Sequence, residues 1–189
     1  MRIALYGGSF NPPHLAHQLA CATVLAAAHP PVDEVWLIPT FQHAFDKPLA
    51  PFVDRLAMCA SSARIFGGLV QLSRIEEELG GASYTLRTVK ALRERHPEHD
   101  FSLVIGTDLV AERPRWHGWE ELSTLIDFTI IGREGVAPLP LSPRDHRVPI
   151  ELPNVSSTEA RRRIAAGEAT EGFLDEHVAA YIAAHQLYR

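Results

Sequence analysis

The chain has 189 residues, which suits one α/β domain with a complete hydrophobic core. Hydrophobic residues make up 46% of it and charged residues 22%, which argues against a disordered chain, and the formal net charge of −5 argues against a general nucleic-acid binder. No apolar run approaches the ~18 residues of a membrane span, and the amino-terminal run is unlike a signal peptide. We therefore expect a soluble protein. Cys21 and Cys59 form no CxxC pair, which fits the reducing cytoplasm.

The first predicted element is a buried strand, Ile3-Ala4-Leu5-Tyr6, and it runs into Gly7-Gly8-Ser9-Phe10-Asn11-Pro12-Pro13-His14-Leu15-Ala16-His17. Glycines permit positive φ and leave no Cβ in the way of a ligand, while prolines suit the beginning of a helix. A helix N-terminus attracts anions, and His14 and His17 project from neighbouring points of one helix face. The segment therefore predicts a phosphate-binding turn. Solvated surface histidines, or half of a metal site, are the alternatives.

Beyond this turn, apolar runs typical of strands alternate with amphipathic stretches typical of helices. Strands are predicted at 35–39, 69–72, 101–106 and 128–133. Helices are predicted from 15 to a stop at 29–31, over about 52–66, from 83 onwards, and at 156–167 and about 174–185. The side chains that carry the helical spacing are Leu15, Leu19, Ala22 and Ala26, then Arg55, Leu56, Cys59 and Ala63, then Leu86, Val89 and Leu92, and finally Val178 and Ile182. This alternation predicts a mostly parallel, doubly wound α/β sheet.

Residues 134–154 carry five prolines and mixed charge. We interpret them as a connecting loop with one short strand near 148–150. Because the next motif belongs with the first, the loop is expected to lie inside one domain that spans residues 1–189, with the helices of about 156–189 packed on it.

That next motif, Val155-Ser156-Ser157-Thr158-Glu159-Ala160-Arg161, begins a helix. Ser156 as N-cap and Glu159 three residues later satisfy the spacing of a capping box, so a plain helix cap is one interpretation. The same hydroxyls and free N–H groups, with Arg161 one turn on, also suit a second phosphate site.

Three shorter segments complete the candidate site. Gly106-Thr107-Asp108 follows a buried strand, where a turn with an Asx-type hydrogen bond is the simple interpretation. Ser83-Tyr84-Thr85 begins a helix, with Ser83 as the expected N-cap. Arg115-Trp116-His117-Gly118-Trp119 places two of the three tryptophans in a polar loop, where an indole packs on the edge of the core or stacks on a planar ligand.

The first segment has the form G-x-F-x-P-x-H-x-x-H and resembles the signature of the T/HxGH superfamily of nucleotidyltransferases. Within that superfamily it is most similar to the bacterial nicotinate mononucleotide adenylyltransferases. Segment 155–161 resembles the ISSTxIR motif of that family, 83–85 its SYT motif, 106–108 its GxD segment and 116–117 its W-[HY] pair. The resemblance extends from residue 3 to Tyr188.

Two positions depart from the family pattern. Ala16 stands where glycine is usual, and its methyl group narrows the space beside the phosphates. The family has a compact PPHK or NPHR where this chain separates His43 from Lys47 by three residues, Phe45 and Asp46 among them.

The resemblance implies a Rossmann-like nucleotidyltransferase fold and transfer of the adenylyl group of ATP to nicotinate mononucleotide, which yields deamido-NAD and pyrophosphate in NAD biosynthesis. It implies Mg²⁺ bound mainly through the ATP phosphates, with no dedicated metal site in the protein. The implied catalytic residues are His14, His17 and Arg161. The residues implied to bind ATP are Gly7, Gly8, Ser9, Phe10, His14, His17, Gly106, Asp108, Arg133, Ser157, Thr158 and Arg161. Those implied to bind the mononucleotide are Lys47, Tyr84, Thr85, Thr107, Asp108 and Trp116, with Trp119 structural.

Segment 41–47 leaves other acceptors open, namely nicotinamide mononucleotide, phosphopantetheine, or an alcohol phosphate with CTP as donor. Segments 83–85 and 116–117 favour a pyridine nucleotide. A nucleotide sensor without catalysis is a further alternative. The retained His14, His17 and Arg161 argue against a sensor, and Ala16 is the one feature in its favour.

Overall fold

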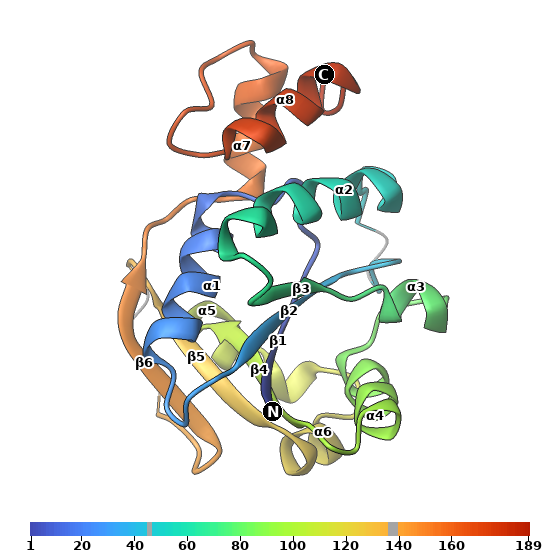
Figure 1. The fold of residues 1–189 in the computed structure, drawn as a ribbon, viewed down its shortest axis with the longest axis vertical. Coiled ribbons are helices and arrows are strands. Elements are labelled where there is room, and N and C mark those ends of the chain that lie inside the picture. Colours follow the sequence, from blue (N-terminus) through green and yellow to red (C-terminus); the bar gives the residue numbers. More distant parts are fainter. Residues whose placement is uncertain (45–46, 136–139) are drawn as a thin grey trace.

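The structure, a computed structural model, describes residues 1–44, 47–135 and 140–189. Its centre is a six-stranded sheet in the order β3-β2-β1-β4-β5-β6, in which every neighbouring pair is parallel (Figure 1). The strands are β1 (Arg2–Gly8), β2 (Glu34–Pro39), β3 (Val70–Leu72), β4 (Asp100–Gly106), β5 (Asp127–Arg133) and β6 (Asp145–Leu152). The predicted parallel α/β sheet is therefore confirmed.

Helices cover both faces of this sheet. The α-helices are α1 (Leu15–Ala27), α2 (Phe52–Ala63), α3 (Ile75–Leu79), α4 (Thr85–Arg95), α5 (Thr107–Val110), α6 (Trp119–Leu125), α7 (Ser157–Ala165) and α8 (Glu176–Ala184), and the short 3-10 helices are η1 (Arg64–Phe66) and η2 (Arg113–Arg115). No helix in the described part of the chain is long and apolar enough to cross a membrane.

The sheet has a separate hydrophobic core on each face, because successive side chains of a strand point to opposite faces. Ile3 and Leu5 of β1 pack with the inner faces of α4 and α6, while Ala4 between them packs with α1 and α2. The helical faces predicted for α4 and α8 are buried as expected, whereas in α2 Arg55 and Cys59 are buried and Leu56 and Ala63 are only partly buried. Cys21 and Cys59 are free thiols buried in the core under α1 and α2.

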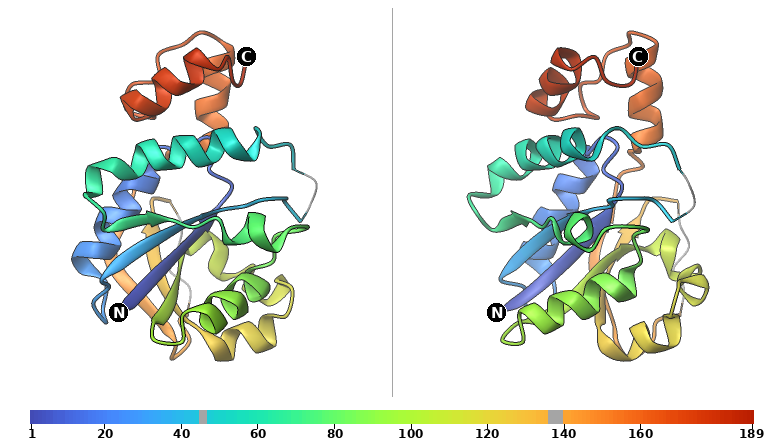
Figure 2. Two further views of the ribbon diagram at one scale, coloured as in Figure 1. Left: turned by 45° about the vertical axis from the view of Figure 1, so that its right-hand side comes forward. Right: turned by 90° about the vertical axis from the view of Figure 1, so that its right-hand side faces the viewer.

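Helices α7 and α8 lie beyond the carboxyl end of the sheet, above α2 (Figure 2). They share a third core in which Met58 of α2 meets Ala160, Leu174, Val178 and Ile182. The predicted C-terminal helical part is thus present, and it packs on the side of the fold where the strands end.

Three local predictions need correction. The stripe that indicated α1 faces solvent, with Leu19 45% exposed, because this alanine-rich helix is apolar on every side and buries Ala20, Cys21 and Val24 instead. The predicted loop at 134–154 contains the eight-residue edge strand β6, and 136–139 lie outside the described residues. Helices α3 and α6 were not predicted, since each buries a single side chain.

Candidate active site

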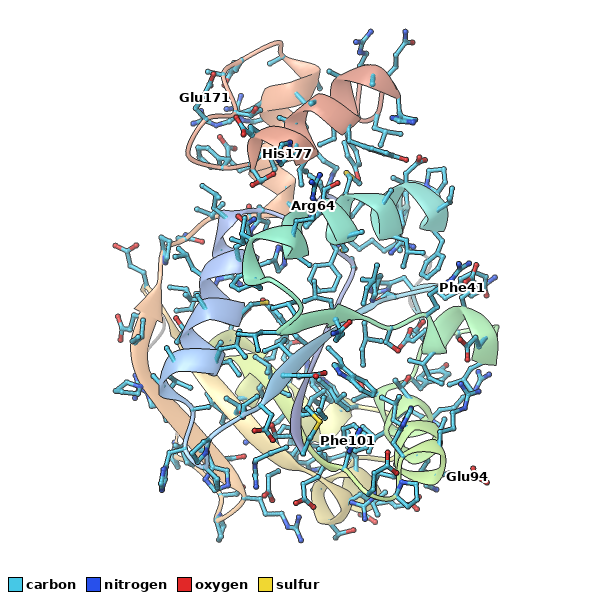
Figure 3. All side chains as sticks on the ribbon, in the orientation of Figure 1. Phe41, Arg64, Glu94, Phe101, Glu171 and His177 are labelled. Atoms are coloured by element: carbon cyan, nitrogen blue, oxygen red, sulfur yellow. The ribbon has the colours of Figure 1, made fainter. Side chains whose placement is uncertain are left out.

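A pocket of about 410 Å³ opens where β1 and β4 end, at the point where the strand order reverses. This is where open parallel α/β sheets bind ligands. In Figure 3, Phe41, just beyond β2, and Phe101, near the start of β4, mark the carboxyl and amino ends of the sheet. The lining residues that the sequence analysis predicted are Gly7, Gly8, Ser9, His14, His17, Thr85, Gly106, Asp108, Trp116 and Arg133.

The turn after β1 differs in detail from its prediction. Gly7 and Gly8 do not adopt positive φ; Phe10 does, with φ of 44°. A Cβ on Gly7 would meet nothing within 4 Å, so this glycine leaves the pocket wall open, whereas a Cβ on Gly8 would lie 3.3 Å from the Phe10 ring. Phe10 is 1% exposed and packs against His17, with 4.9 Å between ring centroids. Phe10 therefore packs against His17 and does not itself line the pocket.

His14 and His17 form a stacked pair at the start of α1, with ring centroids 3.7 Å apart. Burial is the main cause that lowers the pKa of His14 to about 4, and the nearby Arg133 lowers it further. The pKa of His17 is also lowered well below its usual value, by burial first and then by His14 and Arg133. Both shifts favour the neutral form of the imidazoles at pH 7.

One hydrogen bond selects the His17 tautomer. The backbone N–H of His14 donates to Nδ1 of His17 at 3.0 Å, so in the neutral ring the proton sits on Nε2. His17 therefore offers an N–H donor from Nε2. Nδ1 of His14 is buried and has no hydrogen-bond partner within the described residues.

Arg133, at the end of β5, provides the positive charge of the pocket. Its guanidinium donates to Oδ2 of Asp108 at 2.9 Å and to the Val155 carbonyl at 3.3 Å. The Asp108 carboxylate can lie close to the backbone of residue 106 because that residue is glycine: a Cβ there would lie 2.2 Å from Oδ1 of Asp108. The Thr107 hydroxyl instead accepts a hydrogen bond from the Arg133 amide at 3.1 Å, so Thr107 is buried and does not line the pocket.

The start of α7 meets the first motif through the backbone. The Ser157 hydroxyl donates to the Pro12 carbonyl at 2.8 Å, and Arg161 donates to the Asn11 carbonyl at 2.7 Å. Ser157, Thr158 and Arg161 do not line the pocket that holds the histidines. Arg161 lines a second hollow of about 660 Å³, together with Lys47.

The capping box predicted for α7 is half formed. The hydroxyl of Ser156 accepts the Glu159 amide at 3.2 Å, as expected of an N-cap. The Glu159 carboxylate, however, accepts from Arg162 and Arg163 at 2.9 and 3.0 Å and does not return to the cap.

The predicted cap at Ser83 is wrong. Tyr84 occupies the N-cap position of α4 and makes no side-chain cap. The Ser83 hydroxyl accepts a hydrogen bond from the Phe41 amide at 3.0 Å. Thr85 lines the pocket, whereas Tyr84 lies against His117 with 4.6 Å between ring centroids.

The two loop tryptophans have different surroundings. Trp116 lines the pocket and meets Trp119 edge-on at 6.4 Å. Trp119 packs on Phe128 at 5.5 Å and lies 5.3 Å from the Arg113 guanidinium. This placement agrees with a structural Trp119 and leaves the Trp116 ring at the pocket.

Several lining residues were not identified from the sequence, notably Tyr6, Thr40, His43 and Glu76. Glu76 comes from the unpredicted α3 and accepts the Phe41 amide at 3.4 Å and the Thr88 hydroxyl at 2.9 Å. Tyr6 and Thr40 could have been found from the rule that ligands bind at the carboxyl ends of strands. The departure at Phe45 and Asp46 lies outside the described residues.

Carboxylate ligands for a metal are few in the described lining of this pocket. Its carboxylates are Asp108 and Glu76, and each is already hydrogen-bonded. His96, Glu98 and His99, at the turn before β4, hold ligand atoms within 4.8 Å of one another, but they lie at the opposite end of the sheet.

Comparison with known proteins gives consistent results. A family model described as cytidylyltransferase-like matches residues 5–163. A probable nicotinate-nucleotide adenylyltransferase of Anaeromyxobacter is 44% identical, with 99% of this chain and 96% of the relative covered, and one of Myxococcus xanthus is 38% identical, with 100% and 95% covered. Plasmodium falciparum nicotinic acid mononucleotide adenylyltransferase, solved with NaAD, has a similar fold, with a TM-score of 0.84 at 23% identity and 99% and 97% of the two chains covered.

Proposed function

The chain belongs to the cytidylyltransferase-like family and, within it, to the nicotinate-nucleotide adenylyltransferases, and we propose that the pocket at the ends of β1 and β4 is where it joins ATP to nicotinate mononucleotide. The products are deamido-NAD and pyrophosphate. The observation that supports this location best is the contact between the β1–α1 turn and the start of α7, because it joins the two predicted phosphate-binding segments.

In this reaction an oxygen of the mononucleotide phosphate attacks the α-phosphorus of ATP, a new P–O bond forms, and the bond from the α-phosphorus to pyrophosphate breaks. Such transfers depend on positioning and charge stabilisation more than on covalent chemistry by the protein. Nε2–H of His17 would donate to the phosphoryl oxygens, while Arg133 and Arg161 would neutralise the outer phosphates. The negative charges of ATP would also favour protonation of the neutral histidine pair.

The acceptor would lie on the other side of the pocket. Trp116 would stack on the pyridine ring, and Thr85 lies at the N-terminal end of α4, where the helix dipole would favour a carboxylate. Lys47 would meet the mononucleotide phosphate from the second hollow. This side would decide between nicotinate and nicotinamide.

The described residues fit a magnesium ion that arrives with ATP. Mg²⁺ prefers phosphate oxygens and water with few protein ligands, and both pocket carboxylates already have partners. When bound, the ion would neutralise phosphate charge as pyrophosphate departs.

Pyrophosphate release tests the proposal. The protein is mixed with Mg²⁺, ATP and, in separate reactions, nicotinate mononucleotide, nicotinamide mononucleotide or phosphopantetheine, with a control that lacks an acceptor. Release with nicotinate mononucleotide at the highest kcat/KM is expected. A preference for phosphopantetheine, or release with no acceptor, would overturn it.

A further inference from the structure

Asn11 connects four segments of the chain behind the pocket. It is 2% exposed. Its Oδ1 accepts hydrogen bonds from the Ala50 amide at 3.0 Å and from the Tyr188 hydroxyl at 2.8 Å, and its Nδ2 donates to the Pro48 carbonyl at 3.5 Å. Its own carbonyl accepts from Arg161 at 2.7 Å. One carboxamide thus joins the β1–α1 turn to segment 48–50, while its backbone joins the same turn to α7.

The turn that Asn11 belongs to requires support. Phe10, the preceding residue, has positive φ, which is sparsely populated by residues other than glycine and persists only where the surroundings enforce it. On the other side of the turn, buried Arg55 donates to the carbonyls of Ser9 and Ala50, both at 2.9 Å. Arg55 and Asn11 therefore hold the β1–α1 turn and the segment after Lys47 together.

Tyr188 reaches Asn11 because the chain folds back after α8. Gln186 and Tyr188 both have positive φ, of 54° and 64°, and the Leu187 amide donates to the Ile182 carbonyl at 3.1 Å. Burial is the main cause that raises the pKa of Tyr188, so its hydroxyl stays protonated and able to donate at all working pH values. Tyr188 does not line the pocket that contains the histidines; with Asn11 it lines the second hollow, beside Lys47 and Arg161.

We propose that Tyr188 is a positioning residue for adenylyl transfer: its hydroxyl orients the Asn11 carboxamide, which keeps the β1–α1 turn and segment 48–50 in register. This rests on the proposed function, since the turn would hold ATP and Lys47 would hold the mononucleotide phosphate. Asn11 accepts with two lone pairs on Oδ1, and both are used here. Without the hydroxyl the carboxamide can rotate, and the two substrates lose their alignment.

Loss of alignment affects the rate of transfer more than binding. Displacement of reacting groups by about 1 Å costs up to ~100-fold in rate. Because Tyr188→Phe removes one hydroxyl and leaves Arg55 in place, we expect kcat to fall by about 10-fold, while the KM values for ATP and nicotinate mononucleotide change by less than about 3-fold.

Tyr181→Phe is the matched control. The Tyr181 hydroxyl, on α8, donates to Asp54 of α2 at 2.9 Å, so the variant loses the same group from the same C-terminal part without a contact to Asn11. Both variants are expected to lower the unfolding midpoint by a few degrees, but only Tyr188→Phe lowers kcat. In the Asn11→Ala background, Tyr188→Phe is expected to change kcat by less than about 2-fold, because the acceptor is already gone.

Hydrogen exchange at the Ala50 amide gives a readout that needs no activity. Exchange is expected to be several-fold faster in Tyr188→Phe than in wild type or Tyr181→Phe, because Asn11 no longer holds this amide. Unchanged kcat and unchanged Ala50 exchange in Tyr188→Phe, or equal loss of kcat in both tyrosine variants, would overturn the inference. If wild type releases no pyrophosphate with any acceptor, the proposed function fails, and Ala50 exchange still decides the role of Tyr188.

Discussion

Mild acid is expected to destabilise the protein through the histidine pair of the pocket. His14 has a pKa of about 4 in the folded protein against 6.5 in an unfolded chain, with burial as the main cause. Between these values the unfolded state binds a proton that the folded state does not. Stability conferred by the neutral ring is therefore complete above pH 6.5 and is lost as the pH falls toward 4.

The two pKa values set the size of the effect. For one group with these values, the linkage relation gives a loss of about 2 kcal/mol in unfolding free energy between pH 7 and pH 5. For a domain of this length, that corresponds to a fall of about 4–8 °C in the unfolding midpoint. His17 adds to the loss in the same direction, because its pKa is also lowered.

Urea unfolding at intervals from pH 7 to pH 5 measures this loss, in wild type and in His14→Gln. The variant is expected to lose about 2 kcal/mol less than wild type over the range, because glutamine does not titrate. His177→Gln, which removes a mostly exposed ring in α8, serves as the control and is expected to follow wild type. If His14→Gln loses stability in parallel with wild type, the burial argument is refuted.

His17→Ala is expected to abolish pyrophosphate release without a change in the circular dichroism spectrum, because it removes the Nε2 donor at the pocket; retained turnover would contradict that role. Trp116→Ala is expected to raise KM for the mononucleotide by about 10-fold and KM for ATP much less, from the loss of ring stacking. Steady-state kinetics with each substrate varied checks this, and equal rises would exclude stacking. Asp145→Ala leaves Arg113 buried without its two hydrogen bonds of 2.5 and 2.9 Å, so urea unfolding is expected to show a loss of about 3–5 kcal/mol. A loss no larger than that of Lys90→Ala, from an exposed ion pair, would contradict this expectation.

The sheet could be predicted because its inner strands are buried on both faces. Strands β4 and β5 are nearly continuous apolar runs, interrupted only by Ser102 and Thr129, and such runs can be recognised in the sequence. The edge strand β6 exposes half of its residues and contains Pro149, so its composition resembles a loop. The five-residue α3 contributes only Ile75 to the core, and one buried side chain makes no periodic pattern.

Several motif residues could be placed at the pocket from the sequence, whereas orientations that depend on tertiary contacts could not. His14, His17 and Trp116 line the pocket as expected. The sequence does not reveal that Thr107 turns inward to the Arg133 amide, or that Arg161 faces a second hollow. Those orientations follow from hydrogen bonds between residues up to 150 positions apart, which local pattern cannot encode.

The charged groups of the pocket bear on how a protein with net negative charge would bind the polyanionic ATP of the proposed function. The chain carries a formal net charge of −5, and the only carboxylates in the described pocket lining are bound to other groups. Arg133 stands beside two imidazoles whose neutrality it helps to enforce. Under the proposed function, phosphate binding is expected to favour protonation of His14 and His17, which burial disfavours most and Arg133 disfavours further.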